Sequence, residues 1–258
     1  MIDFVYRRGL LRIRQLLFCP SSHINDLTNV DFCAIHSSEH FVRDIPNSKV
    51  YLQYTFINDL TSDEDSIFSN FSKTNQNEIR RCEKENVSYQ CFFDFDRDVV
   101  RDFCKTYNNM FRIKKMNKRF NKSLIIAALK NKKMVITKAS CENNQKCFVY
   151  HAYFYDGINS DLLYSASPVW KNSSNKEDRN LIGRMNKGLH FYDMKILKKE
   201  GIEKYDWGGI GNTPDVLSGI GKFKQSFGGE IACFANYFSA RSGLGKMLFS
   251  LLKVLKKV

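Results

Sequence analysis

The sequence contains little that would mark a membrane-spanning protein, a repeat protein or a chain of linked modules. Only four of the 258 residues are proline, and no internal repeat or low-complexity linker is present. No apolar run approaches the roughly 18 residues that a membrane-spanning helix needs, and the longest, residues 124–129, suits a core helix. Arginines near the start of the sequence interrupt the continuous apolar region that a signal peptide requires. We therefore expect a folded cytoplasmic protein, with the inner face of a membrane as an alternative location.

Cysteine is present but lacks the spacing of metal sites. The eight cysteines include no C-x-x-C pair, and none has a histidine nearby at zinc-ligand spacing. Cys147 and Cys233 lie in apolar runs and are expected to be small core residues. This pattern indicates a reducing compartment and predicts no structural metal.

Acidic residues are scarce in three segments that supply most of the formal net charge of +13. Residues 1–18 hold four arginines against Asp3, residues 111–133 hold nine basic residues and no acid, and residues 241–258 hold five basic residues and no acid. A basic surface neutralises phosphates and could therefore hold transfer RNA. The sequence nevertheless contains no recognised RNA-binding motif.

The last basic segment predicts an amphipathic helix. Apolar residues recur in it at helical spacing, and its lysines lie largely off that stripe. The stripe consists of Leu244, Met247, Leu248, Leu251, Leu252, Leu255 and Val258. Such a helix either packs its leucines on the domain or binds an anionic membrane reversibly.

Hydrophobic periodicity predicts a mixed α/β chain. Strands are expected at residues 32–35, 50–56, 87–93, 134–139, 148–155, 161–166, 202–207 and 231–237. Helices are expected at residues 76–85, at 99–120 as one or two helices, and at 123–130. Asp156 and Gly157, with Asn159, supply a hairpin turn. We expect a small leading subdomain at residues 1–92, a main domain at 93–240 and the basic helix at 241–258.

The most informative stretch is residues 189–230, LHFYDMKILKKEGIEKYDWGGIGNTPDVLSGIGKFKQSFGGE. A helical apolar stripe ends in a basic turn, and Gly201 follows it as a C-cap. A short buried strand comes next, and Gly208 and Gly209 end it where the backbone must turn sharply or approach a ligand closely. A helix that bears lysines follows. We therefore expect a functional site at the end of this strand.

The same stretch carries a family resemblance. The segments KKEGIEKYDWGGI and GIGKFKQSFGGE resemble the FemABX family of peptidyl and aminoacyl transferases, which is built on the GNAT acyltransferase fold. Residues 68–87, FSNFSKTNQNEIRRCEKENV, are similar to the family's serine-rich loop and the "IRR" helix after it. The resemblance covers residues 68–237. It implies a GNAT-like mixed sheet flanked by helices, preceded by a reduced GNAT-like subdomain.

Several phosphate-binding loops can be excluded or disfavoured by spacing. Val216 and Phe223 stand where a Walker loop needs Gly and Ser or Thr, and Pro214 stands where a dinucleotide fingerprint needs a small residue. Typical GNAT acetyltransferases hold the coenzyme A pyrophosphate in an R/Q-x-x-G-x-G/A loop. The nearest match, residues 179–184, is one residue too long and lacks the second small residue. Acetyl-CoA is therefore disfavoured as the acyl donor without being excluded.

Four residues are the candidate catalytic groups. Lys224 matches the lysine of the family's "FK" pair, which the resemblance places at the acceptor site, and Phe223 is its partner. Asp206 could orient an acceptor amine or accept its proton, or it could hold the glycine turn. His190 and Asp193, three residues apart on one helical face, could form a tuned acid/base pair or a buried polar contact. His151 is expected to be a packed or edge residue.

The remaining candidates would bind substrate. Tyr164 and Ser165 lie where GNAT-like proteins hold the donor carbonyl against strand backbone. Arginine side chains suit the phosphates of an activated sugar or a lipid pyrophosphate. The candidates for this role are Arg80, Arg81, Arg179 and Arg184. The glycines Gly208 and Gly209 would let substrate approach the backbone.

The predicted function is transfer of an aminoacyl or other acyl group onto an amine of a peptidoglycan or polysaccharide precursor of the cell envelope. The donor would be aminoacyl-tRNA or an acyl-CoA, with no other cofactor, and the acceptor a nucleotide- or lipid-linked sugar. The chain departs from the family because it is shorter and lacks the charged helical arm that some members use near transfer RNA. Two alternatives stay open, which are an acetyl-CoA-dependent N-acetyltransferase acting on an amino sugar and a non-catalytic basic binding protein.

Overall fold

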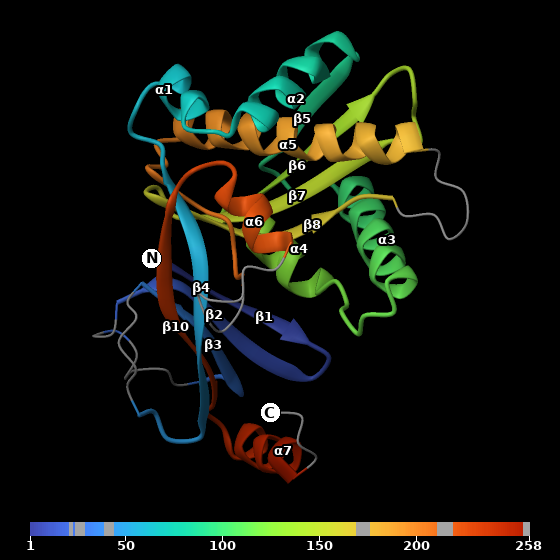
Figure 1. Cartoon of the computed structure of the whole chain (residues 1–258). Coiled ribbons are helices and arrows are strands. Elements are labelled where there is room, and N and C mark those ends of the chain that lie inside the picture. Colours follow the sequence, from blue (N-terminus) through green and yellow to red (C-terminus); the bar gives the residue numbers. More distant parts are fainter. Residues whose placement is uncertain (21–22, 24–28, 39–43, 169–175, 211–218, 255–258) are drawn as a thin grey trace. The chain divides into compact units, whose positions relative to one another are not determined.

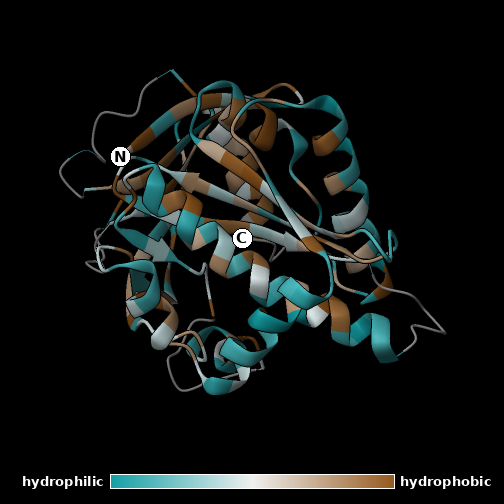
Figure 2. Ribbon diagram, turned by 90° about the horizontal axis from the view of Figure 1, so that it is seen from above, coloured by the Kyte–Doolittle hydropathy of each residue, from teal (hydrophilic) through white to brown (hydrophobic). Residues whose placement is uncertain are grey.

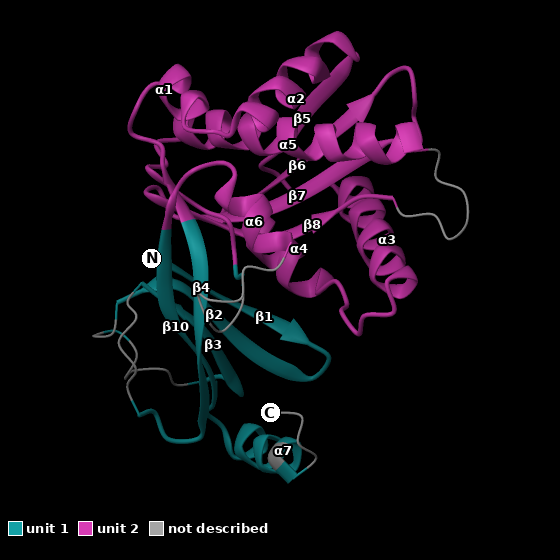
Figure 3. Ribbon diagram, viewed as in Figure 1, with its two compact units in different colours: residues 1–56, 209–218, 231–258 teal, residues 57–208, 219–230 magenta. Residues whose placement is uncertain are grey.

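The structure is a computed structural model that describes residues 1–20, 23, 29–38, 44–168, 176–210 and 219–254 (Figure 1). It divides into two compact units (Figure 3). The first contains residues 1–56, 209–218 and 231–258, and the second contains residues 57–208 and 219–230. The boundary expected after residue 92 lies inside the second unit, and residues 231–240 group with the first. These groupings arise because sheet pairing joins segments that are distant in the sequence.

The first unit is built on strands β1 (Ile2–Arg8), β2 (Leu11–Cys19), β3 (Phe32–Ser37), β4 (Ser48–Asp59) and β10 (Glu230–Ala240). Their order is β1-β2-β3-β10-β4, and β4 continues into the second unit. The β1–β2 and β3–β10 pairs are antiparallel, whereas β2 and β3 are parallel. Helix α7 (Gly243–Val254) follows β10.

The arginines of residues 1–18 indicate only a basic segment, and the hairpin formed by β1 and β2 is not among the predicted elements. Ile2, Phe4 and Tyr6 alternate with exposed residues, which is the period of a strand with one buried face. This alternation was the signal that could have identified β1. Together with Leu16, Ile35 and their neighbours, the strands of this unit enclose a core of buried apolar side chains.

In the second unit, the order continues from β4 through β9 (Lys204–Asp206), β8 (Asn159–Ala166), β7 (Phe148–Tyr155), β6 (Met134–Cys141) and β5 (Val87–Phe92). Only the β8–β9 pair is parallel among the described pairs of this unit. The helices are α1 (Glu64–Ser69), α2 (Lys73–Lys84), α3 (Arg97–Ile113), α4 (Lys122–Lys130), α5 (Lys176–Lys199) and α6 (Gly219–Gln225). The predicted mixed α/β class is confirmed.

Both faces of β7 are covered by helices. Tyr150 stacks on Phe103 of α3, and the next residue, His151, bonds to Asp193 of α5. Because successive residues of a strand point to opposite faces, α3 and α5 cover opposite sides of the sheet. The helices carry hydrophobic residues on one side and hydrophilic residues on the other (Figure 2). This arrangement explains why β7 is almost continuously buried.

Several sequence predictions can be compared directly with the structure. The predicted turn after β7 is confirmed, because the Asp156 side chain accepts bonds from the backbone N–H groups of Ile158 and Asn159. Cys147 is buried as predicted, whereas Cys233 is only half-buried. Among the described helices, none is sufficiently long and apolar to cross a membrane.

Helix α7 forms where the amphipathic pattern predicted it, but it buries only part of its apolar surface. Gly245 and Phe249 are buried, Leu248 and Leu252 are half-buried, and other members of the predicted stripe are exposed. The expectation that the leucines pack on the domain is therefore correct for one side of the helix. The predicted stripe residues Leu255 and Val258 lie outside the described residues.

Candidate active site at the end of strand β9

The candidate site begins where β8 and β9 stop pairing. Their parallel ladder joins residues 159–161 to residues 204–206 and ends there. Gly208 then takes a φ of +67°, a left-handed conformation that L side chains rarely adopt. A Cβ atom on Gly208 would lie 2.4 Å from the carbonyl oxygen of Leu162. Glycine is required here for its conformation and for the close approach of the backbone at Leu162.

Lys224 of α6 is held against this strand end. Its Nζ donates to the carbonyl oxygens of Trp207 and Gly208, at 2.5 and 2.7 Å. The side chain is buried, so it is not an ordinary solvated lysine. Burial lowers the pKa of Lys224 to about 8, although the nearby carboxylates of Asp206 and Asp161 favour its charged form.

Asp206 is also buried, and its Oδ1 accepts a bond from the Gly208 N–H at 2.8 Å. The carboxylate therefore holds the glycine turn, which is one of the two roles predicted for it. Its negative charge also supports the charge on Lys224. A role toward an acceptor amine stays a prediction. Asp206 and Lys224 together place one carboxylate and one ammonium group at a sharp backbone turn.

Asn58, at the end of β4, connects the elements that carry these groups. Its Oδ1 accepts from Trp207 Nε1 at 2.6 Å, and its Nδ2 donates to the carbonyl oxygen of Phe227 at 2.9 Å. All three residues are buried. No local sequence pattern identifies Asn58, because its partners lie 149 and 169 residues away in the chain.

Aromatic rings enclose the imidazole of His190 beside Lys224. Its ring centroid lies 4.4 Å from that of Trp207 and 5.8 Å from those of Phe223 and Phe227. The predicted partners Phe223 and Lys224 thus flank the same region as His190. The structure brings together these three residues with Asp206 and Gly208.

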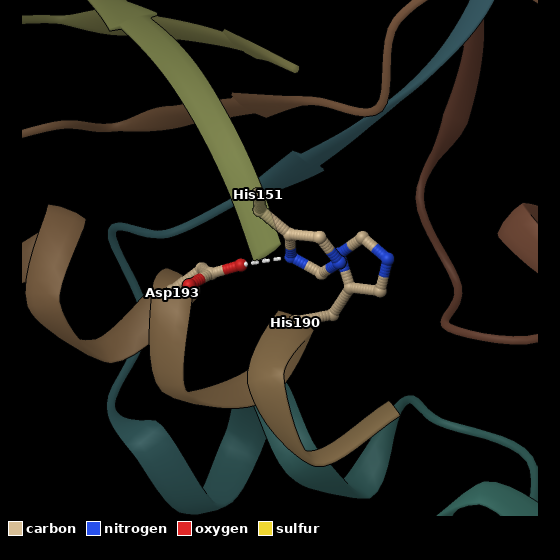
Figure 4. A group of neighbouring side chains, drawn as sticks. All are labelled: His151, His190 and Asp193. Atoms are coloured by element: carbon tan, nitrogen blue, oxygen red, sulfur yellow. Dashed lines mark hydrogen bonds and ion pairs between the residues drawn. The ribbon is translucent and has the colours of Figure 1, made fainter. Parts of the chain in front are cut away.

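A buried network of hydrogen bonds continues from His190. Figure 4 shows His151 of β7 facing His190 and Asp193, both of which belong to α5. His151 Nδ1 lies 2.7 Å from Asp193 Oδ2, to which the Tyr153 hydroxyl also donates at 2.8 Å. The Tyr153 and Tyr205 hydroxyls are bonded to each other, and Tyr205 Oη lies 2.7 Å from His190 Nδ1. His190 and Asp193 are therefore connected through two tyrosines.

The number of available hydrogens determines the tautomer of His190. As a carboxylate, Asp193 only accepts, so Tyr153 donates its single hydrogen to Asp193. Tyr205 must then donate to Tyr153, and Tyr205 can only accept from His190 Nδ1. His190 therefore carries its proton on Nδ1, and its Nε2 keeps a lone pair.

Burial sets the charge states within this network. It raises the pKa values of Tyr153 and Tyr205 well above that of a free tyrosine, so both hydroxyls keep their hydrogens. Burial also lowers the pKa of His190 well below its usual value, and the nearby charges of His151 and Lys224 act in the same direction. His190 is consequently neutral at pH 7.

Among the residues that the structure describes, His151, His190 and Asp193 form a group whose ligand atoms could reach one metal ion, since these atoms lie within 4.8 Å of one another. Two ligands of a tetrahedral zinc at about 2.1 Å would be separated by about 3.4 Å. The 2.7 Å between His151 Nδ1 and Asp193 Oδ2 is instead a hydrogen-bond distance. The geometry fits a hydrogen-bonded network better than a metal centre, and the absence of a structural metal stays a prediction.

The other predicted residues lie in separate environments. The Tyr164 hydroxyl accepts from the Asn121 N–H at 3.2 Å, and its ring packs on Tyr107 and Phe120. Ser165 is half-buried and pairs in register with His151 across β8 and β7. Neither residue contacts Lys224 in the described interactions. Their role toward a donor carbonyl stays a prediction.

The four arginines do not form one cluster in the described contacts. Arg184 bonds to both carboxylate oxygens of Glu85, at 2.8 and 2.7 Å, and Arg81 pairs with the same carboxylate. Arg80 lies 5.1 Å above the Phe68 ring, and Arg179 is exposed in the first turn of α5. Their proposed contact with phosphates stays a prediction. Arg184 and Arg81 already have a structural partner.

Gly209 belongs to the first unit and lies beside β4. A Cβ atom there would lie 3.0 Å from the Gln53 side chain, so this glycine allows close packing. The next residue, Ile210, donates its N–H to the carbonyl oxygen of Tyr54 at 2.8 Å. Protein atoms thus lie close to both glycines, and the approach of substrate to their backbone stays a prediction.

Comparison with known proteins gives matches only at the level of structure. No protein-family model matches the chain, and no curated protein matches it. The chain superposes on "FemX" with a TM-score of 0.56 and 16% identity, over 79% of this chain and 65% of that one. The fold is FemABX-like.

Two further structures superpose on this FemABX-like fold. One is the C-terminal domain of a putative lysylphosphatidylglycerol synthetase from Agrobacterium fabrum, with a TM-score of 0.51 and 10% identity over 99% of this chain and 87% of that one. The other is a protein of unknown function from Bacteroides thetaiotaomicron, with a TM-score of 0.51 and 7% identity over 93% and 82%. The predicted family resemblance is confirmed for the fold.

Sequence patterns identify several residues of the site but not the partners that these residues contact. The "FK" pattern and the spacing on the long helix identified Lys224, Phe223, His190 and Asp193. Residues that complete the network come from β4, β7 and β9, and no local motif marks them. His151 lies on a central strand, so the expectation of an edge residue is wrong, whereas the expectation of a packed residue is confirmed. A run of Tyr and His on a fully buried strand was the available signal.

Proposed function

We propose that this protein is an acyltransferase that moves an aminoacyl or other acyl group onto an amine of a cell-envelope precursor. The observation that carries the proposal is the buried ammonium group of Lys224 at the end of β9, supported by the carboxylate of Asp206. A desolvated cation at a preorganised backbone turn interacts strongly with negative charge that develops in a reaction. The FemABX-like fold supports this class of chemistry by analogy.

The proposed reaction is aminolysis of an activated ester. The amine nitrogen forms a bond to the acyl carbon, the carbon–oxygen bond of the ester breaks, and the proton lost by the amine is gained by the leaving oxygen, which departs as a hydroxyl group. The intermediate carries an oxyanion, which Lys224 would stabilise while it is charged. Because His190 is neutral, it does not compete with Lys224 for negative charge.

An aminoacyl group is the acyl group that we favour. The sequence lacks the usual pyrophosphate loop of coenzyme A enzymes, and residues 111–133 carry nine basic residues and no acid. One of the similar structures is a domain named for lysylphosphatidylglycerol synthesis, which is an aminoacyl transfer. We propose charged transfer RNA as the donor and a nucleotide- or lipid-linked sugar as the acceptor, in the cytoplasm or at the inner face of the membrane.

A binding titration tests the donor. The purified protein is titrated with charged transfer RNA and, separately, with acetyl-CoA, at moderate salt so that nonspecific attraction to a basic protein is suppressed. We expect saturable binding of one charged transfer RNA and none of acetyl-CoA. Saturable binding of acetyl-CoA would instead make the protein an N-acetyltransferase, and binding of neither would count against both donors.

A pair of lysine variants tests whether the protein is a catalyst. Lys224→Met should abolish acyl transfer, because the lost charge acts on the transition state. The affinity of this variant for the donor should stay within severalfold of the wild-type affinity. Lys222→Met is the matched control, since Lys222 lies on the same helix but is exposed. Full activity in both variants would exclude the proposed role of Lys224.

A further inference from the structure

Helix α7 leaves a stripe of large apolar side chains uncovered. Leu244, Met247, Leu251 and Val254 are 47%, 55%, 53% and 81% exposed. Their spacing of three, four and three residues places them on one face of the helix. Isolated exposed apolar residues are common, but four on one helical face require a partner or a function.

The helix has three distinct faces. At 100° per residue, the exposed stripe spans roughly one quarter of the circumference, and the buried Gly245 and Phe249 lie on another side. Lys246 is exposed between these two faces, about 100° from Met247. One face is thus used for packing on the first unit, while a second apolar face remains with a basic residue beside it.

The start of α7 is anchored next to the β1–β2 hairpin. The Asp31 carboxylate accepts from the Arg12 N–H at 2.8 Å and from the Ser242 hydroxyl at 2.5 Å. The Ser242 hydroxyl in turn accepts from the Gly245 N–H at 3.0 Å, within the first turn of α7. The helix and the hairpin therefore belong to one continuous region of the first unit.

The tip of the β1–β2 hairpin also has an exposed apolar side chain beside basic side chains. Leu10 is 92% exposed, and the exposed arginines Arg7, Arg8 and Arg12 flank it. The sequence from residue 241 to 258 adds five basic residues and no acid. Exposed leucine and methionine side chains next to basic side chains fit a surface that is both apolar and anionic.

We propose that α7 and the tip of the β1–β2 hairpin bind peripherally to the surface of an anionic lipid bilayer. The stripe would insert at the boundary between headgroups and acyl chains, and Lys246, Arg7 and Arg8 would contact the headgroups. A second copy of the chain fits less well, because two copies meeting through this face would bring together like charges. The surface lies in the first unit and does not depend on Lys224.

Vesicle co-sedimentation tests the proposal. The probes are vesicles of one part phosphatidylglycerol to two parts phosphatidylcholine, and vesicles of phosphatidylcholine alone. We expect the protein to bind the anionic vesicles, with the bound fraction falling as salt is raised. Replacing both Met247 and Leu251 with serine should weaken binding by about tenfold or more, because two buried side chains are lost from the interface.

Two further variants make the result specific. Ile158→Ser removes an apolar side chain that is 52% exposed in the second unit, and it should leave vesicle binding unchanged. Leu10→Ser, at the hairpin tip, should weaken binding severalfold, and it keeps the test decisive if the α7 variant fails to fold by circular dichroism. Equal binding by wild type and Leu10→Ser, or equal binding to both kinds of vesicle, would overturn the proposal. The proposal would also be overturned if the protein bound no vesicles but self-associated, and if the Met247 and Leu251 substitutions abolished that self-association.

Discussion

At the scale of single residues, the site depends on a glycine that no other residue can replace without strain. Gly208 combines a φ of +67° with a distance of 2.4 Å from its hypothetical Cβ to the Leu162 carbonyl oxygen. We expect Gly208→Ala to lower the free energy of unfolding by about 2–4 kcal/mol, from backbone strain and the displaced strand. Urea denaturation measures the change.

Gly157→Ala is the matched control for Gly208. Gly157 also has a positive φ, +102°, but has no atom within 4 Å of a hypothetical Cβ. Gly157→Ala should lower the free energy of unfolding by only about 1–2 kcal/mol, the cost of the unfavourable backbone conformation alone. Equal losses for the two variants would show that the contact with Leu162 contributes nothing.

The charge on Lys224 predicts a pH dependence of catalysis. Its pKa in the folded protein, about 8, lies below the usual 10.5, so the ammonium is present below pH 8 and is lost as the pH rises through that value. Transfer should therefore decline above about pH 8 in a pH–rate profile. Lys224→Arg should lose this decline while keeping some activity, because arginine stays charged. A wild-type rate that is flat through pH 9 would contradict the cationic role.

The lowered pKa of Lys224 also makes the free energy of unfolding depend on pH. Because the folded pKa is lowered, the unfolded chain binds more protons between about pH 8 and 10.5. The destabilising effect of burying this charge is complete below pH 8 and diminishes as the pH rises through that range. The protein therefore places a lysine at an energetic disadvantage that an ordinary surface position would avoid.

At the scale of elements, Asn58 joins the ends of β4, β9 and α6 through one amide side chain. Asn58→Leu would leave Trp207 Nε1 and the Phe227 carbonyl oxygen buried without their partner. We expect a loss of about 2–5 kcal/mol in the free energy of unfolding, from two unsatisfied polar groups. Chemical denaturation followed by far-ultraviolet circular dichroism measures it.

The control for Asn58 is an asparagine whose side chain bonds within its own turn. Asn131, which caps α4, is exposed and donates from Nδ2 to the Ala127 carbonyl oxygen at 2.8 Å. Asn131→Ala should lower the free energy of unfolding by about 1 kcal/mol or less. A similar loss for the two variants would mean that Asn58 does not join these elements energetically.

At the scale of the whole molecule, the chain passes repeatedly between its two units. Strand β10 comes late in the sequence but lies between β3 and β4 in the first unit. A chain ending at residue 230 should therefore lose slow hydrogen exchange in β2 and β3, while the β6 and β7 amides stay protected. Mass spectrometry of exchange by segment checks this. Protection of β2 and β3 equal to that of the full chain would show that the first unit folds without β10.

The sequence by itself determined the type of most elements, because helical and strand periodicities are local properties. It also located Lys224 next to Phe223, and His190 three residues before Asp193, since these spacings lie within single helices. Only the tertiary structure decided which side chains meet. His151 reaches Asp193 across 42 residues and Asn58 reaches Trp207 across 149, because sheet order and helix packing, rather than neighbouring sequence, bring them together. The tertiary structure likewise decided which side of α7 is buried and which apolar stripe is left in solvent.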